Sequence, residues 1–299
     1  MHRLGVTLVI TADIGISNKN EIAYGKSLGI ETIVTDHHPI VDCPECIIVN
    51  PEHEKNKGIT KYCGAGLAYL LMKELYEKLS IKFDEDNDLI SHATIATIGD
   101  LVSLTKNNYF LVKRGLRAIN RCTNAKGIRW VMNFVNKYLP NKELISATDI
   151  AFNVVPLMNS LNRVSVPKKA TEFFLSNDAE EVEILGKYII EKNKARKETQ
   201  IKSILEAIKI INKRKLYNSK IVFLDLDIRK TFAGLVASYI TSDLLNVPSI
   251  VVSKDSNGNY YGSGRSIKSC SLTELIRRLQ PYCIKTGGYK SGFPICENR

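Results

Sequence analysis

Near the N-terminus, short β-rich runs alternate with a polar, helix-favouring segment. Three runs are rich in apolar, mostly β-branched residues: VTLVITAD (6–13), ETIVTDHH (31–38) and CIIVNP (46–51). Between the first two lies SNKNEIAYGKSLG, which closes at Gly29 as a capped helix does. Strand, helix and strand at this spacing form a βαβ unit, so we expect a parallel sheet.

Helical periodicity dominates the next part of the chain. Apolar positions three and four residues apart predict helices near residues 64–80, 87–99, 107–121 and 127–138. The segment PLMNSLNRVSVP that follows is bracketed by two prolines, and we expect it to be irregular.

A long polar run and a second βαβ pattern make up the rest. The run at 178–214 favours one helix, whose basic face suits a phosphate backbone, although a solvated surface helix is the commoner case. After it come a strand at 220–227, a helix near 231–245, a strand at 248–255, NYYGSGRSI (259–267) and a helix near 271–280. The expected fold class is α/β: an incomplete parallel-sheet domain with a helical part (1–185), a connecting helix (186–215) and a smaller α/β domain (216–299).

The composition is that of a globular protein. The chain has 299 residues, of which 44% are hydrophobic and 24% charged, which argues against disorder and against a disulfide scaffold. No apolar run approaches the ~18 residues of a membrane span, so no membrane is expected as a partner. Seven cysteines without a secretory signal indicate a reducing, cytoplasmic location.

Charge is distributed unevenly along the chain. Residues 1–100 carry 9 Lys and Arg against 15 Asp and Glu, while residues 101–299 carry 33 against 16. The net charge of +11 therefore divides into −6 and +17. All five histidines lie in the acidic part. This pattern favours a metal site attached to a polyanion-binding body, and the alternative is a general enrichment in Lys, Asn and Ile.

Acids and histidines stand at or near the ends of predicted elements. Asp13 ends the first strand, Asp36, His37 and His38 end the second, and Asp100 follows a helix. Ligands of parallel α/β sheets collect outside the carboxyl ends of the strands. Carboxylates mixed with imidazoles suit Mn²⁺ or a similar ion, and two such ions about 3.5–4 Å apart would activate water and neutralise a phosphate. Taken singly, Asp13 and Asp100 could also serve only as capping acids. The three contiguous polar residues Asp36, His37 and His38 are harder to explain by a purely structural role.

A weaker metal pattern involves cysteine. Cys43 and Cys46 have the spacing of half a zinc site, with His53 and Cys63 downstream. The second half lacks a compact paired spacing. The Gly64-Ala65-Gly66 segment has no Gly-Lys-Ser/Thr after it, which favours the first turn of a helix beside the site over a phosphate loop.

Taken together, the motifs resemble a known family. TADIGIS, VTDHHP, CGAGLAYLL, TIGDLVSL, PLMNSLNR, AGLVASYITSDLLNVPSIVVS, GSGRSI and TGGY stand in the order typical of DHH phosphoesterases with a DHHA1 domain. Within them the chain is similar to the RecJ branch, whose members digest single-stranded DNA from the 5′ end. The resemblance spans essentially the whole chain.

The resemblance assigns roles to individual residues. It implies that Asp13, His37 and Asp100 are metal ligands, that Asp36 is a ligand or orients the histidine pair, and that His38 acts at the scissile phosphate. The remaining residues that it assigns would contact substrate: Arg265, Ser266, Gly264, Gly287, Gly288, Asn159 and Arg163. The cofactor it implies is Mn²⁺ or Mg²⁺, in a two-metal site.

The chain also departs from the family pattern. An Asp-x-Asp motif with a nearby His should precede Asp13, and no such motif occurs in the twelve residues before it. Tyr289 stands where the family has His, and the small-residue segment after it is short. We therefore expect one metal to be retained and hydrolysis by this chain alone to be weak or absent, unless a second chain supplies the first motif.

Three functions follow from these observations. The leading hypothesis is a RecJ-like, metal-dependent 5′→3′ exonuclease that hydrolyses single-stranded DNA in repair and recombination. The second is a DHH–DHHA1 phosphodiesterase that acts on short oligonucleotides or cyclic dinucleotides. The third is a non-catalytic DNA-binding remnant, or one half of a split enzyme.

Overall fold

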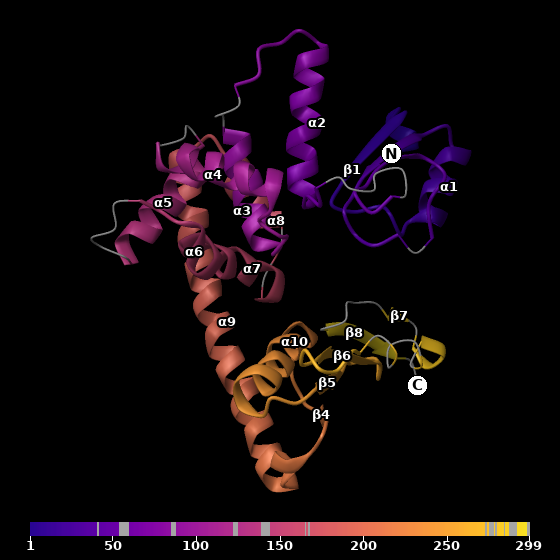
Figure 1. Cartoon of the computed structure of the whole chain (residues 1–299), viewed down its shortest axis with the longest axis vertical. Helices are drawn as coiled ribbons and strands as arrows, with labels where there is room; N and C mark the ends of the chain where they lie inside the picture. Colours follow the sequence, from indigo (N-terminus) through magenta and orange to yellow (C-terminus); the bar gives the residue numbers. More distant parts are fainter. Residues whose placement is uncertain are drawn as a thin grey trace. The chain divides into compact units, whose positions relative to one another are not determined.

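Figure 1 shows the computed structural model of the chain. It describes residues 1–40, 42–53, 60–84, 88–121, 125–138, 144–164, 166, 168–272, 274, 278, 280–283, 285–286 and 292–297. The chain divides into two compact units. The first comprises residues 1–159 and 166–189, and the second residues 160–165 and 190–299.

A small parallel sheet begins the first unit, after a 3₁₀ turn η1 (His2–Leu4). Its strands lie in the order β1 (Leu8–Ala12), β2 (Glu31–Thr35) and β3 (Ile47–Val49), and helix α1 (Lys19–Ser27) connects the first two. Leu8 pairs with Glu31 and Ala12 with Thr35, so the carboxyl ends of β1 and β2 are level. The predicted parallel sheet is therefore confirmed.

The two faces of this sheet differ in their covering. On one face, Val34 packs with Ile16 and with Ile22 of α1 in a small buried cluster. The other face carries four exposed apolar side chains, which are Leu8, Ile10, Ile47 and Val49. All-parallel sheets normally have both faces covered, so a bare apolar face is unusual.

Helices form the rest of the first unit. They are α2 (Gly64–Lys78), α3 (Asp88–Gly99), α4 (Lys106–Asn120), α5 (Lys126–Tyr138), α6 (Ala147–Asp149), the π-helical turn η3 (Ile150–Val154), α7 (Val155–Val164) and α8 (Lys168–Leu175). The four predicted helices correspond to α2–α5.

One prediction for this region was wrong. The segment that begins at Pro156 is helical, because α6, η3 and α7 follow one another without a break. The Val155 N–H donates to the Ile150 carbonyl in a π turn directly before Pro156, and this local change of pitch accommodates a residue that has no backbone N–H. The preceding π turn makes the transition into α7.

The long polar run forms α9 (Ala179–Arg214), one continuous helix of 36 residues. The division between the two units falls within it, after Ile189. Near its C-terminal end, Ala207 and Ile211 are fully buried against the core of the second unit. The single helix predicted for residues 178–214 thus forms, and its last turns belong to a hydrophobic core.

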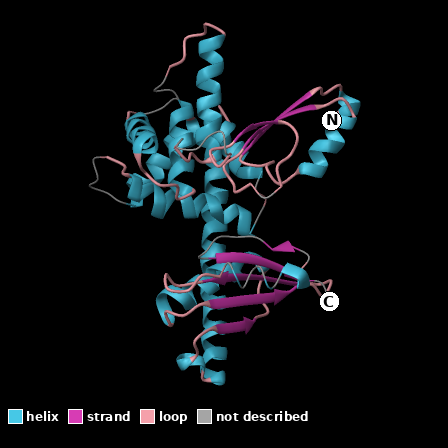
Figure 2. Ribbon diagram, turned by 45° about the vertical axis from the view of Figure 1, so that its right-hand side comes forward, coloured by secondary structure: helices cyan, strands magenta, loops and turns pink. Residues whose placement is uncertain are grey.

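The second unit is built on a mixed sheet, which Figure 2 shows as one layer of strands. The strand order is β4 (Val222–Asp225), β5 (Ser249–Lys254), β6 (Tyr260–Arg265), β8 (Gly292–Glu297) and β7 (Lys285–Thr286). β4 and β5 are parallel and flank α10 (Lys230–Tyr239) with its π turn η5 (Ile240–Leu244), while the other pairs are antiparallel. The 3₁₀ turns η4 (Leu216–Asn218) and η6 (Gln280–Tyr282) complete it.

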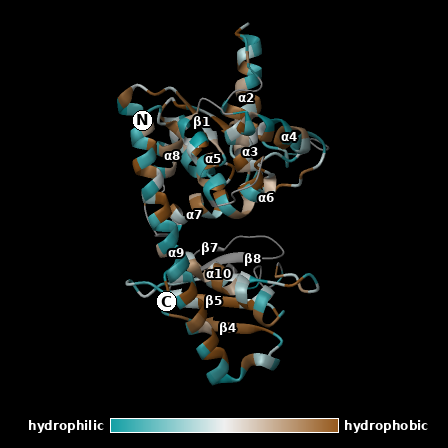
Figure 3. Cartoon of the chain, turned by 90° about the vertical axis from the view of Figure 1, so that its left-hand side faces the viewer, coloured by the Kyte–Doolittle hydropathy of each residue, from teal (hydrophilic) through white to brown (hydrophobic). Residues whose placement is uncertain are grey.

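The core of the second unit lies between its sheet and its helices. Leu224, Val236 and Val251 are fully buried there, and Figure 3 shows the hydrophobic colouring of β4 and β5. An α/β fold with a parallel sheet, a helical region, a long helix and a second small sheet is therefore confirmed. None of the described helices is both long and apolar enough to cross a membrane.

Candidate metal centre and substrate-binding residues

Two of the predicted ligand positions meet at the carboxyl end of the first sheet. The Asp13 N–H donates to the Thr35 carbonyl at 2.9 Å, and the Asp36 N–H donates to the Val49 carbonyl at 3.1 Å. The ladder thus continues one residue beyond β1 and β2 and holds Asp13 and Asp36 at the same edge. Asp13 adopts a left-handed conformation with φ of 66°, which aspartate tolerates better than most residues.

Asp36 is buried and fully used as a hydrogen-bond acceptor. Its Oδ2 accepts from the Ile16 N–H at 3.0 Å, and its Oδ1 accepts from the N–H groups of His37 and His38. The same Oδ1 lies 2.7 Å from Nδ1 of His38. Burial raises the pKa of the Asp36 carboxyl, but the bonds from Ile16, from the His38 ring and from the two backbone N–H groups outweigh it, so its pKa lies below the usual range. These contacts suit an orienting residue rather than a metal ligand.

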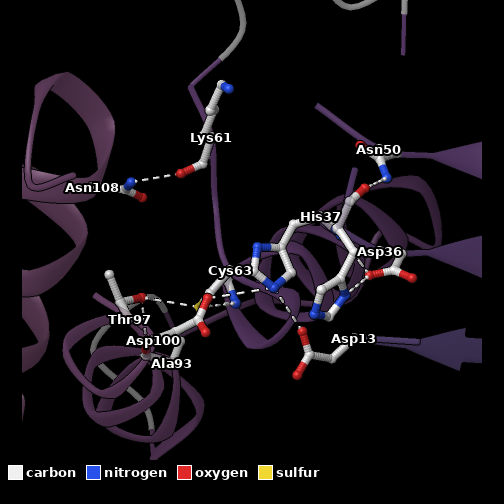
Figure 4. A network of polar contacts seen from close by, with 12 residues as sticks. Asp13, Asp36, His37, Asn50, Lys61, Cys63, Ala93, Thr97, Asp100 and Asn108 are labelled. Atoms are coloured by element: carbon white, nitrogen blue, oxygen red, sulfur yellow. Dashed lines mark hydrogen bonds and ion pairs between the residues drawn. The ribbon is translucent and has the colours of Figure 1, made fainter. Parts of the chain in front are cut away.

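His37 points between two carboxylates (Figure 4). Its Nε2 lies 3.0 Å from Oδ1 of Asp13 and 3.4 Å from Oδ2 of Asp100. This nitrogen is buried, yet neither approach has the geometry of a hydrogen bond. A buried nitrogen without a hydrogen bond normally carries a cost, unless a ligand satisfies it.

The donors around His37 therefore fit a divalent ion. Ligand atoms of Asp13, His37 and His38 lie within 4.8 Å of one another, which is the only such group of three among the described residues. Because Nδ1 of His38 faces Asp36, Nε2 of His38 is the nitrogen left for an ion or a phosphate. Carboxylate and imidazole together suit Mn²⁺ and related ions.

Asp100 reaches the same place from the end of α3. Burial raises the pKa of its carboxyl; the histidines His37 and His38 oppose this rise, while the nearby Asp13 carboxylate adds to it. Two carboxylates that face one imidazole repel each other unless a cation lies between them.

The first turn of α2 lies against Asp13. A Cβ built on Gly64 would overlap the side chain of Asp13, so only glycine allows this approach. The helix N-terminus favours a negative charge beside it. Cys63, the N-cap, accepts from the Gly66 N–H and lies 3.4 Å from the Thr97 hydroxyl. The interpretation of this segment as a helix turn beside the site is confirmed, and the Cys63 thiol takes part in this capping.

A cavity of about 550 Å³ opens beside the metal-ligand group. Asp13 and Asp100 line this cavity, and Asn159 of α7 lines it as well. The structure thus brings Asn159, a predicted substrate contact, together with two predicted metal ligands. Sequence reasoning missed His92 and Phe174, which also line this cavity. His92 lies two helical turns before Asp100, a spacing that could have indicated it.

The other predicted substrate contacts belong to the second unit. Arg265 ends β6, and its Nη1 donates to the Ser263 hydroxyl at 3.0 Å and to the Gly264 carbonyl at 2.8 Å. Gly264 is buried within the sheet between β5 and β8. Ser266 instead donates to the Cys270 carbonyl at 2.7 Å. Ser263, rather than Ser266, is therefore the serine in contact with Arg265.

Arg265 belongs to an arginine cluster with Arg163 and Arg196. Burial lowers the pKa of each guanidinium, and the charge of Arg163 lowers the pKa of the other two further. Arg163 donates to the Thr231 carbonyl, and Arg196 donates to the side-chain oxygens of Asn193 and Gln200. Within the described part of the chain, none of the three forms an ion pair with a carboxylate. Arg196 was not anticipated from the sequence.

Two predicted residues cannot be placed. Gly287 and Gly288 lie outside the described residues, as does Tyr289. Their contact with phosphate stays a prediction.

Comparisons with known proteins agree with this architecture. Residues 2–99 match the DHH family, N-terminal domain. The single-stranded-DNA-specific exonuclease RecJ of Haemophilus influenzae is 30% identical over 303 residues, which cover 95% of this chain and 52% of that protein. RecJ of Thermus thermophilus is 31% identical over 300 residues, which cover 99% of this chain and 42% of that protein. The chain thus spans about half the length of these relatives, or less.

Solved structures show the same relationship. A crystal structure of Thermus thermophilus RecJ in complex with Mn²⁺ matches 98% of this chain and 42% of its own, with a TM-score of 0.81 and 27% identity. A structure of exonuclease RecJ bound to manganese matches 98% of this chain and 71% of its own, with a TM-score of 0.77 and 26% identity. Residues 2–99 are thus similar to the N-terminal domain of the DHH family, and the chain is similar to RecJ in sequence and fold over almost its full length.

Proposed function

We propose that this protein is a metal-dependent phosphodiesterase that acts on single-stranded DNA as a 5′→3′ exonuclease of the RecJ type. The observation that carries the proposal is the convergence of Asp13, His37 and Asp100 around a buried nitrogen that has no hydrogen bond. The substrate class comes from the relatives, which are named as single-stranded-DNA-specific exonucleases. The ion comes from solved RecJ structures that contain Mn²⁺.

Each residue of the centre has a separate task. Asp13, His37 and Asp100 would hold the ion, with Asp13 placed by Gly64 and the first turn of α2. A divalent ion bound there would supply positive charge to the phosphate oxygens and would lower the pKa of water. Asp36 fixes the ring of His38 through Nδ1, which leaves Nε2 to contact the scissile phosphate or the leaving oxygen.

The second unit supports binding of a polyanion. The arginine cluster has only neutral hydrogen-bond acceptors, so a phosphate would provide the missing negative charge. Residues 101–299, which include the whole second unit and part of the first, carry a large excess of Lys and Arg, which attracts nucleic acid without regard to sequence. The described cysteines do not form disulfides with one another, which suits action in the cytoplasm; they are Cys43, Cys46, Cys63, Cys270 and Cys283.

A two-metal reaction needs more ligands than the described residues bring together. We infer that another polypeptide segment, on this protein or on a second chain, supplies them at the outer edge of β1. The bare apolar face formed by Leu8, Ile10, Ile47 and Val49 supports this inference, since a covering element would bury it.

The test measures the binding of Mn²⁺ and the hydrolysis of DNA separately. The 299-residue chain is titrated with Mn²⁺ under electron paramagnetic resonance, and release of nucleotides from a long 5′-phosphorylated strand is compared with cleavage of a dinucleotide. We expect one tightly bound ion per chain, lost in Asp13→Asn, and slow digestion of the long strand. Absence of Mn²⁺ binding would contradict the assigned centre. Two ions with rapid digestion would contradict the inferred external segment, and preference for the dinucleotide would contradict the substrate class.

A further inference from the structure

We propose that the cavity beside Asp13 and Asp100 is a nucleoside subsite, in which Phe174, His92 and Asn159 bind the base of the nucleotide whose phosphate lies at the metal centre. This inference rests on the proposed function, because it assigns a part of the substrate to the same site. The inference goes beyond the proposed function because it names the base as the part of the nucleotide that is bound, and it names the residues that bind it. The neighbouring helices α2, α3, α7 and α8 all contribute to the cavity.

The walls of the cavity have the character of a base-binding pocket. Its apolar lining includes Ile95, Val155 and Met158, and the polar groups Asn159 and His92 stand among them. Small-molecule sites typically combine apolar and aromatic walls with a few polar groups that fix orientation. The volume of about 550 Å³ lies within the ~300–1,000 Å³ of such sites, which suits a nucleoside.

The cavity extends away from the metal ligands along α3. His92 and Asp100 both line it and are eight residues apart, which corresponds to about 12 Å along a helix axis. One extended nucleotide bridges a comparable distance from its phosphate to the outer edge of its base. A phosphate held at Asp13 and Asp100 would therefore place its base toward His92.

Phe174 provides an aromatic wall that is held in place. Its ring packs edge-to-face on His92, with centroids 5.4 Å apart, and on the fully buried Phe173, with centroids 5.1 Å apart. Phe174 itself is only partly buried and lines the cavity. Stacking on an aromatic ring binds any base, because every base has a π-face. This tolerance suits an enzyme that removes nucleotides irrespective of sequence.

His92 presents a defined hydrogen-bonding edge. Its Nδ1 lies 2.8 Å from the Asp88 carbonyl, and a carbonyl can only accept, so Nδ1 carries the proton. In the neutral ring Nε2 is then an acceptor, which can receive an exocyclic amino group of a base. Asn159, on the opposite helix α7, offers both a donor and an acceptor and so adapts to different bases. Gly99 allows α3 and α7 to approach, since a Cβ there would lie 3.2 Å from Cγ2 of Val155.

The experiment compares ligands with and without a base. The Mn²⁺-loaded chain is titrated in a calorimeter with 2′-deoxyadenosine 5′-monophosphate and with 2-deoxyribose 5-phosphate. We expect the nucleotide to bind at least about fivefold more tightly, as stacking of one base implies. Phe174→Leu and His92→Gln should each reduce this ratio, and Asn159→Ala, at an exposed position, should do so without risk to folding.

Two control variants and a titration without metal complete the experiment. Phe152→Leu and Asn107→Ala change exposed residues outside the cavity and should leave the ratio unchanged. Deoxyadenosine alone, titrated in the presence of a chelator, should still bind weakly to the wild-type chain and not to Phe174→Leu. The proposal is overturned if the two phosphates bind equally, or if the cavity variants retain the wild-type ratio. Loss of Mn²⁺ binding together with retained deoxyadenosine binding would refute the metal centre and leave the nucleoside subsite standing.

Discussion

The side chain of Asp13 occupies the space that a Cβ on Gly64 would need. This relationship joins the end of β1 to the first turn of α2 and fixes where the carboxylate can lie. It also brings the positive end of a helix to the proposed metal ligand Asp13, whose negative charge it stabilises. The position of the ligand thus depends on a residue that has no side chain of its own.

Gly64→Ala should therefore damage the metal centre. The added methyl group would displace the Asp13 carboxylate, and we expect Mn²⁺ affinity to fall about 10- to 100-fold, as for other changes to supporting residues. The matched control is Gly66→Ala in the same turn, where a Cβ meets Tyr62 at an ordinary 3.4 Å. This control should keep its Mn²⁺ affinity and gain up to about 1 kcal/mol of helix stability. Equal Mn²⁺ affinities in the two variants would contradict the assigned role of Gly64.

Asp100→Asn should stabilise the metal-free protein. The pKa of Asp100 is raised in the folded state, so its ionised form at neutral pH disfavours folding, and stability increases as pH falls through this raised pKa. Removal of the charge should raise the melting temperature in the presence of a chelator and flatten this pH dependence. It should also abolish the additional stabilisation that Mn²⁺ gives to the wild type. Glu74→Gln, at an exposed position of α2, serves as the control and should change neither quantity.

Asp36→Asn should have the opposite effect on stability. The pKa of Asp36 is lowered in the folded state, so its contribution is present above the ordinary aspartate pKa and is lost as pH falls through the lowered value. We expect a loss of about 2 to 3 kcal/mol near neutral pH, because an amide cannot accept all four hydrogen bonds. The difference from wild type should shrink in acid. Urea unfolding across pH tests this, with the exposed Asp42→Asn as control.

Part of the candidate metal centre could be predicted from the sequence, namely the part that local sequence patterns determine. Two β-rich runs that end in Asp13 and Asp36 define neighbouring strands, and parallel strands carry their carboxyl ends at one edge. Asp100 reaches the centre only because of how α3 packs, and no local sequence pattern predicts that packing. The resemblance to a family, rather than periodicity, assigned that residue.

Other features could not be predicted from the sequence, and each of them has a physical reason. Pro156 suggested an irregular segment, but a π turn before it changes what a proline there signifies. The resemblance to the family assigned Ser266 a phosphate contact, whereas in β6 it is Ser263 whose hydroxyl accepts a hydrogen bond from Arg265. In a strand, side chains two residues apart share a face, so Ser263 and Arg265 belong together. Phe174 and His92 meet only through packing of α8 on α3.

Arg265→Gln should weaken binding of single-stranded DNA and reduce its dependence on salt. Arg265 is half-buried, and its hydrogen-bond acceptors, the Ser263 hydroxyl and the Gly264 carbonyl, are neutral, so a bound phosphate would supply the negative charge that they lack. Loss of one phosphate contact should lower the slope of log K against log salt concentration by about 1. Arg214→Gln, an exposed change at the end of α9, removes the same charge and should alter the slope less. Fluorescence anisotropy of a labelled strand over a salt series measures both variants, and equal slopes would show that only net charge matters.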